Sequence, residues 1–282
     1  MVGFRFNYAL LPTSYITSLE ASSSTPDSSG PKIITEILNM DSNYKLTDSI
    51  GKISDIGYTT GSILDPEDLK KAQEIIACHI SKLNNEITTF EDILLYRAKG
   101  LQDIAINKSK RIFSAEDAEL FLTLPSIKIL ISKFPTFKVS NALDPIKGLI
   151  PTPEVYFRIV RPNSGGAPSA AHIDFWYDDL YNLEMNVRPR LKVWISLFTE
   201  PGKNGLLVKP KKDSAGFHYR TLQTSFGPRP SLIDPPDIST YDFPYIKPGD
   251  GVIFDCESVL HLGAPNNGQM ARISVEIALQ YR

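Results

Sequence analysis

The residues of this chain best suited to chemistry are a His-x-Asp pair, His172 and Asp174, and a distant histidine, His261. Side chains at positions i and i+2 of an extended strand point the same way, so we expect His172 and Asp174 to reach one ion together. A second imidazole from His261 would complete two histidines and one carboxylate on one face of a metal. This ligand set is typical of non-heme Fe(II), and it leaves the opposite face open.

An arginine and a serine follow the distant histidine as Arg272-x-Ser274. The intervening PNNG predicts a β-hairpin: a turn at 266–267 places His261 opposite Arg272, and a turn at 267–268 places it opposite Ser274. Both registers put the three side chains on one face of the sheet. A guanidinium aimed inward needs an anionic partner, because an unpaired buried charge is costly. Its fork of donors suits a carboxylate, so we expect a bound dicarboxylate.

Each of these residues also has an ordinary structural explanation. His172 and Asp174 could hydrogen-bond to each other in a loop, and His261 could be a satisfied core histidine. Arg272 could pair with a carboxylate of its own chain, for which the candidates are Glu276 and Asp255. Because these explanations would all have to coincide in the right order, we favour the metal site.

The second half of the chain has the pattern of a β protein. From about Glu154, the segments EVYFRIV, LKVWISLF, GVIFD and ARISVEIALQY alternate or are rich in β-branched residues. Long loops rich in proline and glycine separate them. This arrangement predicts a double-stranded β-helix, a jelly-roll or cupin-like double sheet.

The first half reads as mainly helical. Asp65-Pro66 predicts the start of a helix that continues through LKKAQEIIACHISKLNNEI, and Ser114 predicts the cap of a second helix. A polar Ser/Thr/Pro stretch at 22–31 predicts a linker.

We therefore predict an α+β fold in which one domain spans residues 1–282. In this prediction, residues 1 to about 150 supply helical support and lid elements. Residues from about 151 to 282 form the jelly-roll core that carries the metal site.

Composition narrows the functional classes. The chain has 282 residues, a formal charge of -2 and two cysteines, which gives no hint of a nucleic-acid or membrane-surface partner and argues against a disulfide scaffold. Its first residues, MVGFRFNYALLPTSYI, contain no apolar run of the length of a signal peptide or membrane span. We expect a cytoplasmic protein with a small-molecule substrate.

Together these segments resemble the Fe(II)/2-oxoglutarate-dependent dioxygenase superfamily, in its phytanoyl-CoA dioxygenase-like branch. The resemblance covers the C-terminal half from Tyr156, and the matching segments follow in the family's order: YFRIVRP, AHIDFWYDD, LKVWISLFTEPGKNGLLVKP and KPGDGVIFDCESVLHLGAPNNGQMARISVEI. One departure is that Pro210 precedes KKDS, where the family often has Gly-Ser-His. An aspartate at 174 disfavours the halogenase variant, which has a small residue there.

The resemblance implies the roles of the site residues. Fe(II) would be held by His172, Asp174 and His261, and 2-oxoglutarate by Arg272 with Ser274 assisting. The implied enzyme consumes 2-oxoglutarate and O2, releases succinate and CO2, and hydroxylates an unactivated C–H bond of a small-molecule metabolite.

Further candidates line the strand before the metal motif. Tyr156 and Arg158 share one face of EVYFRIV, so an inward-facing arginine would contact 2-oxoglutarate or a substrate carboxylate. The alternative is a solvated arginine on the outer face.

Substrate candidates lie near the metal motif and on the next strand. Trp176 and Tyr177 follow the motif directly and would line the substrate pocket, with aromatic packing in a loop as the alternative. Trp194 lies on the next strand, LKVWISLF, and fits the core better than a substrate wall. Arg190 could bind an anionic group of the substrate, with a solvated loop as the alternative.

Two other functions remain open at this point. The chain could hydroxylate a protein or carrier-bound substrate, for which the basic run at 209–212 would suit a partner surface. It could also be a non-catalytic, cupin-like protein that binds a metal or ligand. The complete ligand set together with Arg272 argues against the latter.

Overall fold

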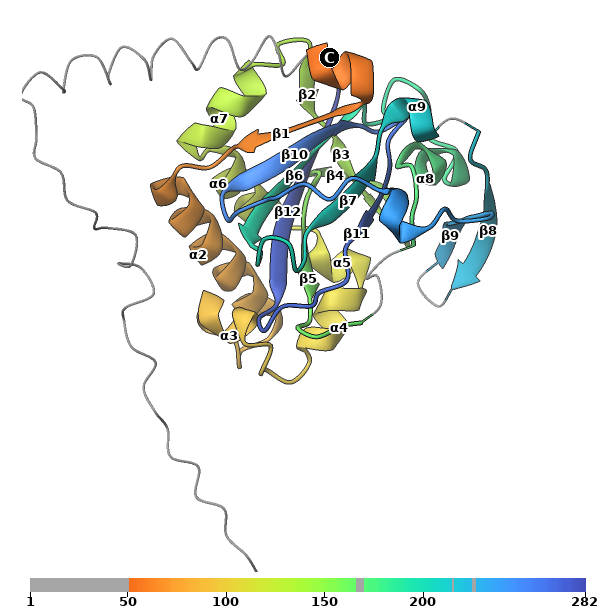
Figure 1. Ribbon diagram of the computed structural model, residues 1–282. Coiled ribbons are helices and arrows are strands. Elements are labelled where there is room, and N and C mark those ends of the chain that lie inside the picture. The colour runs from red at the N-terminus through yellow and green to blue at the C-terminus, as the bar shows by residue number, and fades with distance from the viewer. Residues whose placement is uncertain (1–50, 166–169, 215, 225–226) are drawn as a thin grey trace, which may run out of the picture. The chain divides into compact units, whose positions relative to one another are not determined.

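The computed structural model describes residues 51–165, 170–214, 216–224 and 227–282 (Figure 1). These residues form a mixed structure of helices and antiparallel sheets, as the predicted α+β class requires. The linker predicted at 22–31 lies outside the described residues. Within them, no helix has the length and apolar character needed to cross a membrane.

Six strands form the main sheet, and its paired neighbours are antiparallel. The order runs β1, β10, β6, β12, and β12 then pairs with β5 along one part of its length and with β2 along another. The bounds are β1 (Tyr58–Ser62), β2 (Phe137–Val139), β5 (Val155–Val160), β6 (Leu191–Phe198), β10 (Asp250–Asp255) and β12 (Arg272–Tyr281). Strands β5, β6, β10 and β12 confirm the four segments predicted from alternation and β-branched content.

A smaller sheet pairs β7 (Leu206–Lys209) with β11 (Leu260–Gly263). Isolated bridges extend it on both sides, from His261 to His172 and from Val208 to Asp242. Two further antiparallel pairs flank these sheets: β3 (Asn141–Asp144) with β4 (Gly148–Pro153), and β8 (Tyr219–Thr224) with β9 (Gly227–Leu232).

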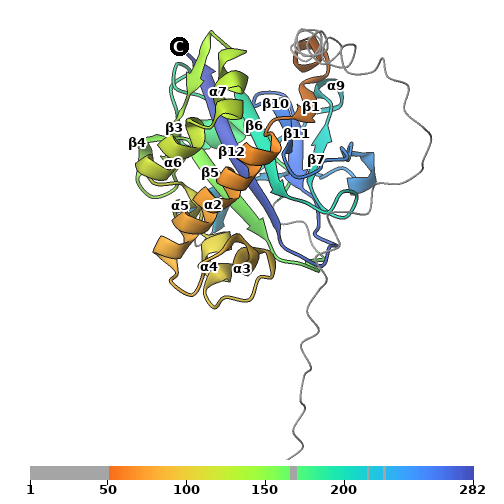
Figure 2. The same ribbon diagram turned by 90° about the vertical axis from the view of Figure 1, so that its left-hand side faces the viewer.

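Most helices precede the strands of the core and cover one face of the main sheet, as Figure 2 shows for α2, α6 and α7. Asp65 caps α2 by accepting a 2.8 Å hydrogen bond from the Asp68 amide, and Ser114 caps α6, which confirms both predicted helix starts. The helices are α2 (Pro66–Leu83), α3 (Phe90–Leu94), α4 (Leu101–Ile106), α5 (Lys108–Arg111), α6 (Ala115–Leu122), α7 (Pro125–Ser132), α8 (Phe175–Leu180), α9 (Lys211–Ser214) and the 3-10 helix η2 (Ile238–Thr240).

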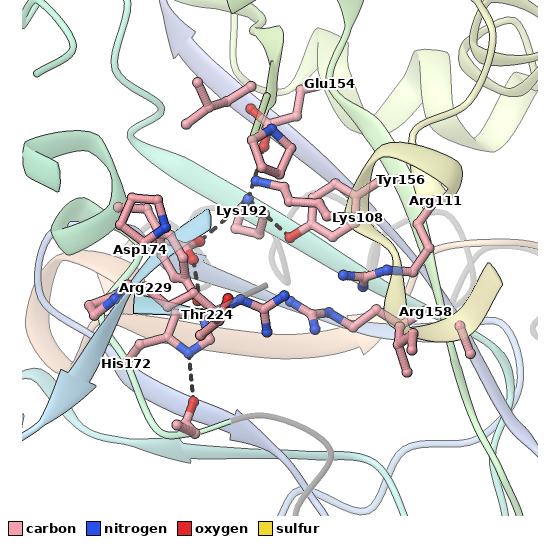
Figure 3. A pocket seen from close by; sticks show the side chains of 18 of the residues that line it. Lys108, Arg111, Glu154, Tyr156, Arg158, His172, Asp174, Lys192, Thr224 and Arg229 are labelled. Atoms are coloured by element: carbon pink, nitrogen blue, oxygen red, sulfur yellow. Dashed lines mark hydrogen bonds and ion pairs between the residues drawn. The ribbon is translucent and has the colours of Figure 1, made fainter. Parts of the chain in front are cut away.

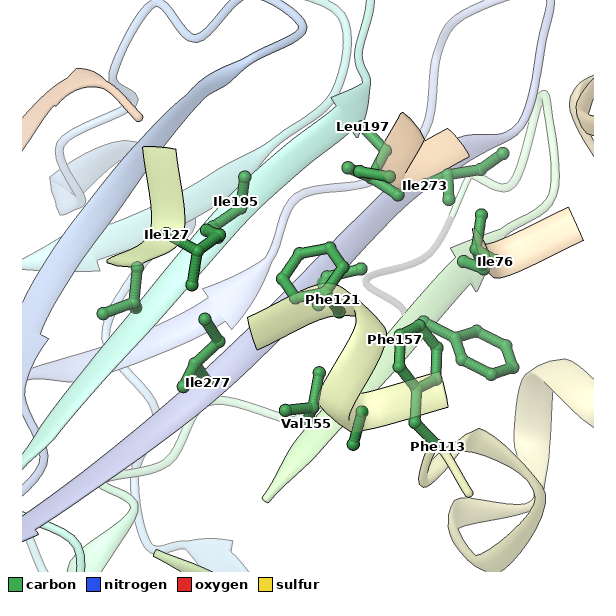
Figure 4. Packing of buried hydrophobic residues seen from close by; sticks show 14 of the residues in the cluster. Ile76, Phe113, Phe121, Ile127, Val155, Phe157, Ile195, Leu197, Ile273 and Ile277 are labelled. Atoms are coloured by element: carbon green, nitrogen blue, oxygen red, sulfur yellow. The ribbon is translucent and has the colours of Figure 1, made fainter. Parts of the chain in front are cut away.

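The two faces of β12 separate the core from the interior that holds the site. Ile273, Val275 and Ile277 are fully buried against the helical layer, where they pack with side chains such as Ile76 and Phe121 (Figure 4). Because side chains alternate along a strand, the other face carries a different set. That face presents polar residues, among them Arg272, Ser274 and Glu276.

The predicted hairpin is wrong. Strand β11 pairs with β7, where His261 faces Val208, whereas β12 pairs with β6 and β5. The PNNG segment instead crosses from the small sheet to the main sheet. It is anchored by the fully buried Asn266, whose Nδ2 donates to the carbonyl groups of Val160 and Met270. His261 and Arg272 still line one cavity, because side chains of the two sheets pack together, such as Trp194 with Val208.

The described part of the first half also contains strands that were not predicted. Strand β1 extends the main sheet beyond β10, and β2, β3 and β4 precede residue 154. The β1 sequence YTTGS is short and carries four polar or glycine positions, so no alternation of apolar residues marks it. It is specified by pairing with the edge of β10, which is a tertiary interaction.

Candidate metal centre

The structure brings the three predicted metal ligands together. One donor atom each from His172, Asp174 and His261 lies within 4.8 Å of the others. Oδ1 of Asp174 lies 3.5 Å from Nε2 of His172 and 3.7 Å from Nε2 of His261. Both histidines are buried, so an ion there would be held largely away from solvent.

Backbone pairing positions the two histidines. His172 and His261 form an antiparallel bridge with reciprocal hydrogen bonds of 3.0 Å, which sets their ring centroids 4.5 Å apart. The Nδ1 of His172 donates to the carbonyl oxygen of Ala170 at 2.8 Å, and that of His261 donates to the carbonyl oxygen of Val259 at 3.1 Å. A carbonyl oxygen only accepts, so both Nε2 atoms keep a free lone pair for a cation.

Asp174 reaches the histidines by a route that differs from the prediction. His172 is extended, but Asp174 has helical dihedral angles, φ -58° and ψ -37°, and stands at the start of α8. The expectation of one extended strand across both residues is therefore wrong. The turn into α8 carries the carboxylate back toward His172.

Charge around the carboxylate keeps it ionised. Burial raises the pKa of Asp174, but the Lys192 ammonium and the two imidazoles outweigh it and hold this pKa well below its usual range. Burial and repulsion from His172 lower the pKa of His261 to about 4. At neutral pH the centre thus offers a carboxylate and a neutral imidazole, which are the protonation states that a metal binds.

Arg272 has spare donors beside this centre. It is fully buried, its Nη1 donates to the carbonyl oxygen of Gly205, and its Nε and Nη2 have no hydrogen-bond partner in the described chain. Burial and repulsion from Arg158 lower its pKa to about 9. The Oγ of Ser274 also lacks a partner among these residues. The two guanidinium donors without partners and the nearby hydroxyl are suited to binding a carboxylate.

Tyr156 and Arg158 point toward the same interior. Arg158 Nε donates to Oε1 of Glu276 at 2.8 Å, and the Tyr156 hydroxyl donates to the other oxygen of that carboxylate. Glu276 therefore pairs with Arg158 and not with Arg272, which was the structural alternative considered for Arg272. Its place two residues beyond Ser274 on the same face of β12 is the signal that would have predicted a buried position.

A cavity of about 700 Å³ opens beside His172 and Asp174 (Figure 3). Tyr177, a predicted substrate residue, lines it with its ring 5.2 Å from the His172 ring. The helical half contributes Lys108 and Arg111 from α5, which the sequence analysis did not identify. No spacing marks them, because the run KSKR reads equally well as a solvated helical turn.

The other three predicted substrate residues do not line this cavity. Trp176 stacks on Tyr219 at 5.2 Å, and Arg190 forms an ion pair with Glu257. Trp194 is buried between the sheets, and the guanidinium carbon of Arg272 lies 5.9 Å from its ring. Trp194 thus borders the small cavity that also contains Arg272 and His261.

No protein-family model and no curated protein matches this sequence. Solved structures do. The apo form of ThoJ, described as a non-heme monooxygenase, has a TM-score of 0.53 and 13% identity, over 82% of this chain and 76% of that one. EvdO2 from Micromonospora carbonacea var. aurantiaca, complexed with 2-oxoglutarate, has a TM-score of 0.54 and 13% identity, over 83% and 90%.

SnoN, described as a non-heme alpha ketoglutarate dependent epimerase from nogalamycin biosynthesis, has a TM-score of 0.50 and 12% identity, over 85% of this chain and 84% of that one. At such identities a likeness speaks to the fold. The described chain has the fold that these three solved structures share.

Proposed function

We propose that this chain is an Fe(II)- and 2-oxoglutarate-dependent oxygenase that hydroxylates an unactivated C–H bond of a small-molecule metabolite. The observation that carries the proposal is the convergence of His172, Asp174 and His261 beside Arg272, a buried guanidinium with unused donors. The fold supports it, because similar structures include a non-heme monooxygenase and a complex with 2-oxoglutarate.

In this proposal the three clustered side chains would hold Fe(II), and the bound metal would supply the oxygen chemistry of a 2-oxoglutarate-dependent oxygenase. His172 and His261 bind through Nε2, because each Nδ1 is already used by a backbone carbonyl. Asp174 supplies the charged ligand, and its neighbour Lys192 keeps it deprotonated.

Arg272 and Ser274 would hold the cosubstrate. The two spare donors of Arg272 would bind its far carboxylate as a fork, and the Ser274 hydroxyl would add a third hydrogen bond. Tyr156 and Arg158 form the adjoining wall, where Glu276 fixes both of them. Arg158 borders both cavities, so it separates the cosubstrate from the substrate.

We further propose that the facing sheets form a double-stranded β-helix within a single domain. Residues from about 151 to 282 would supply this jelly roll, and the preceding helices would support it and close the cavity. The two histidine ligands sit on the small sheet and at its edge, while Arg272 lies on the main sheet, which supports this arrangement. The two free cysteines, Cys78 and Cys256, fit a reducing cytoplasm.

The test uses the full chain with Fe(II), ascorbate and oxygen. We expect succinate to form from 2-oxoglutarate, and 2-oxoglutarate to raise the unfolding midpoint only when the metal is bound, because a ligand stabilises the state it binds. Metal binding without either effect would favour a non-catalytic binding protein. Turnover that requires a protein fraction of a cell extract, and not its metabolite fraction, would favour the protein hydroxylase.

A further inference from the structure

The large cavity beside the metal centre has an excess of positive charge. Three carboxylates border it: Glu154, Asp174 and Asp178. Six cationic side chains border it: Lys108, Arg111, Arg158, Arg161, Lys192 and Arg229. They come from the helical half, from the main sheet and from β9, so no single local charge run explains the excess.

Part of this charge is neutralised by the protein. Lys192 lies 3.3 Å from Oε1 of Glu154 and 3.4 Å from Oδ2 of Asp174. Arg158 pairs with Glu276 at 2.8 Å. These ion pairs use Glu154, Asp174 and Glu276.

Lys108 and Arg111, one turn apart on α5, differ from Lys192 and Arg158 in having no carboxylate partner among the described residues. Neither forms an ion pair with any residue that the structure describes. Arg111 is 7% exposed, and its Nε has no hydrogen-bond partner in the described ranges. Lys108 instead lies over two aromatic rings, 6.0 Å from the centroid of Tyr156 and 5.8 Å from that of Tyr177.

This arrangement is costly without a partner. Burial lowers the pKa of Lys108 to about 8, and burial together with repulsion from Arg158 lowers the pKa of Arg111 to about 10. Arg229 adds to that repulsion. Figure 3 shows the guanidinium groups of Arg111 and Arg158 directed into the same space. Gathering like charges at low exposure costs free energy, and a bound anion would offset this cost.

The position of the pair matches a substrate. The Tyr177 ring lies 5.8 Å from the Lys108 ammonium and 5.2 Å from the His172 ring. This one ring therefore contacts both a residue of the cationic pair and a predicted metal ligand. A small metabolite would span this interval with its reacting C–H at the metal.

We propose that the substrate carries an anionic group, a carboxylate or a phosphate, which Lys108 and Arg111 bind at the wall of the large cavity. That this ligand is the substrate rests on the proposed oxygenase function, whereas the anion site itself does not. The site is distinct from the one proposed for 2-oxoglutarate, because Arg272 borders the small cavity and neither Lys108 nor Arg111 does.

The test measures binding to the metal-free full chain by calorimetry, without 2-oxoglutarate. The probes are phenyl phosphate, phenylacetate and the neutral 2-phenylethanol. We expect at least one anionic probe to bind about tenfold or more tightly than the alcohol, because its hydrogen bonds are charge-assisted. A preference between the two anions identifies the group that the site takes.

Substitutions show where the anionic probe binds. Lys108→Met and Arg111→Gln should each lower the affinity for this probe by about tenfold or more. Lys110→Met is the matched control, since Lys110 lies on the same helix, does not border the cavity and pairs with Asp103. It should leave the affinity unchanged, whereas Arg272→Met shows whether a probe occupies the site proposed for 2-oxoglutarate instead.

Equal affinity for the anionic probes and the alcohol would overturn the proposal. So would an equal loss in Lys110→Met, or loss of binding in Arg272→Met alone. Equal affinity on the unaltered chain decides against the proposal even if a variant fails to fold. Because iron and turnover are absent, an inactive enzyme that binds the anion would refute only the oxygenase function, and an active enzyme that ignores it would refute only the anion site.

Discussion

The ammonium of Lys192 lies 3.4 Å from Oδ2 of Asp174, on the carboxylate oxygen that does not face the histidines. Glu154 holds the same ammonium from the other side at 3.3 Å. Lys192 thereby orients Asp174 so that Oδ1 is left for the metal. Burial opposes the charge of Lys192, but the two carboxylates raise its pKa well above the ordinary value, so it stays cationic.

We expect Lys192→Met to weaken metal binding by about tenfold, the lower end of what loss of an outer-shell partner costs. The substitution also leaves Glu154 buried without its cation, so the free energy of unfolding should fall by about 3 kcal/mol. Calorimetry with Ni(II) and urea denaturation measure the two effects. Lys138→Met, on the exposed side of β2, is the control. Tighter metal binding would mean that the positive charge of Lys192 opposes the ion more than its contact positions Asp174.

The buried imidazole of His261 should make the metal-free protein sensitive to mild acid. Its pKa is about 4 in the folded chain and near 6.5 when unfolded, so the unfolded state binds more protons between these values. Stability is therefore complete above pH 6.5 and is lost as the pH falls toward 4, by at most about 3 kcal/mol. Urea denaturation at a series of pH values measures this loss. His261→Asn should flatten the curve in this window, and an unchanged curve would contradict the assignment.

Arg272→Met should separate binding from stability. Loss of the charge-assisted contacts, worth about 1.5–3 kcal/mol, should lower the affinity for 2-oxoglutarate by about tenfold or more. The protein without 2-oxoglutarate should be no less stable, because the substitution removes a fully buried charge that has two unused donors. Calorimetry and thermal unfolding give the two readings. A strongly destabilised variant with normal 2-oxoglutarate affinity would assign Arg272 a structural role.

The residues that the sequence predicted well are those whose spacing is local. Alternation along β12 separates Arg272 and Ser274 from the apolar Ile273 and Val275, and the structure confirms this division. The cap at Asp65 is equally local, since it needs only the next few residues. These features depend on the strand and helix periods alone.

The features that escaped prediction depend on tertiary contacts. Lys108 and Arg111 are ordinary charged residues in sequence, and only the packing of α5 beside β5 directs them inward. Asp174 was expected on a strand, but the chain turns into a helix there. The PNNG segment has the residues of a hairpin turn, and turn residues do not reveal which strands the turn connects.

Asn266 explains why this turn becomes a crossover, and it provides the last prediction. Its amide nitrogen donates to the carbonyl groups of Val160 and Met270, and its Oδ1 accepts hydrogen bonds from Gly268 and Asn204. Asn266→Ala should lower the free energy of unfolding by about 3 kcal/mol, since buried groups lose their partners. The neighbouring Asn267→Ala, at an exposed position, should change it by less than about 0.5 kcal/mol.

Loss of Asn266 should also reach the site. The crossover leads directly into Arg272, whereas the metal ligands lie outside this segment. A loosened segment should therefore reduce the affinity for 2-oxoglutarate more than the affinity for the metal. Calorimetry of both ligands on Asn266→Ala and Asn267→Ala makes this comparison. Equal losses for metal and 2-oxoglutarate would indicate general unfolding, and no loss of either would mean that pairing of β12 with β5 and β6 positions Arg272 without the crossover.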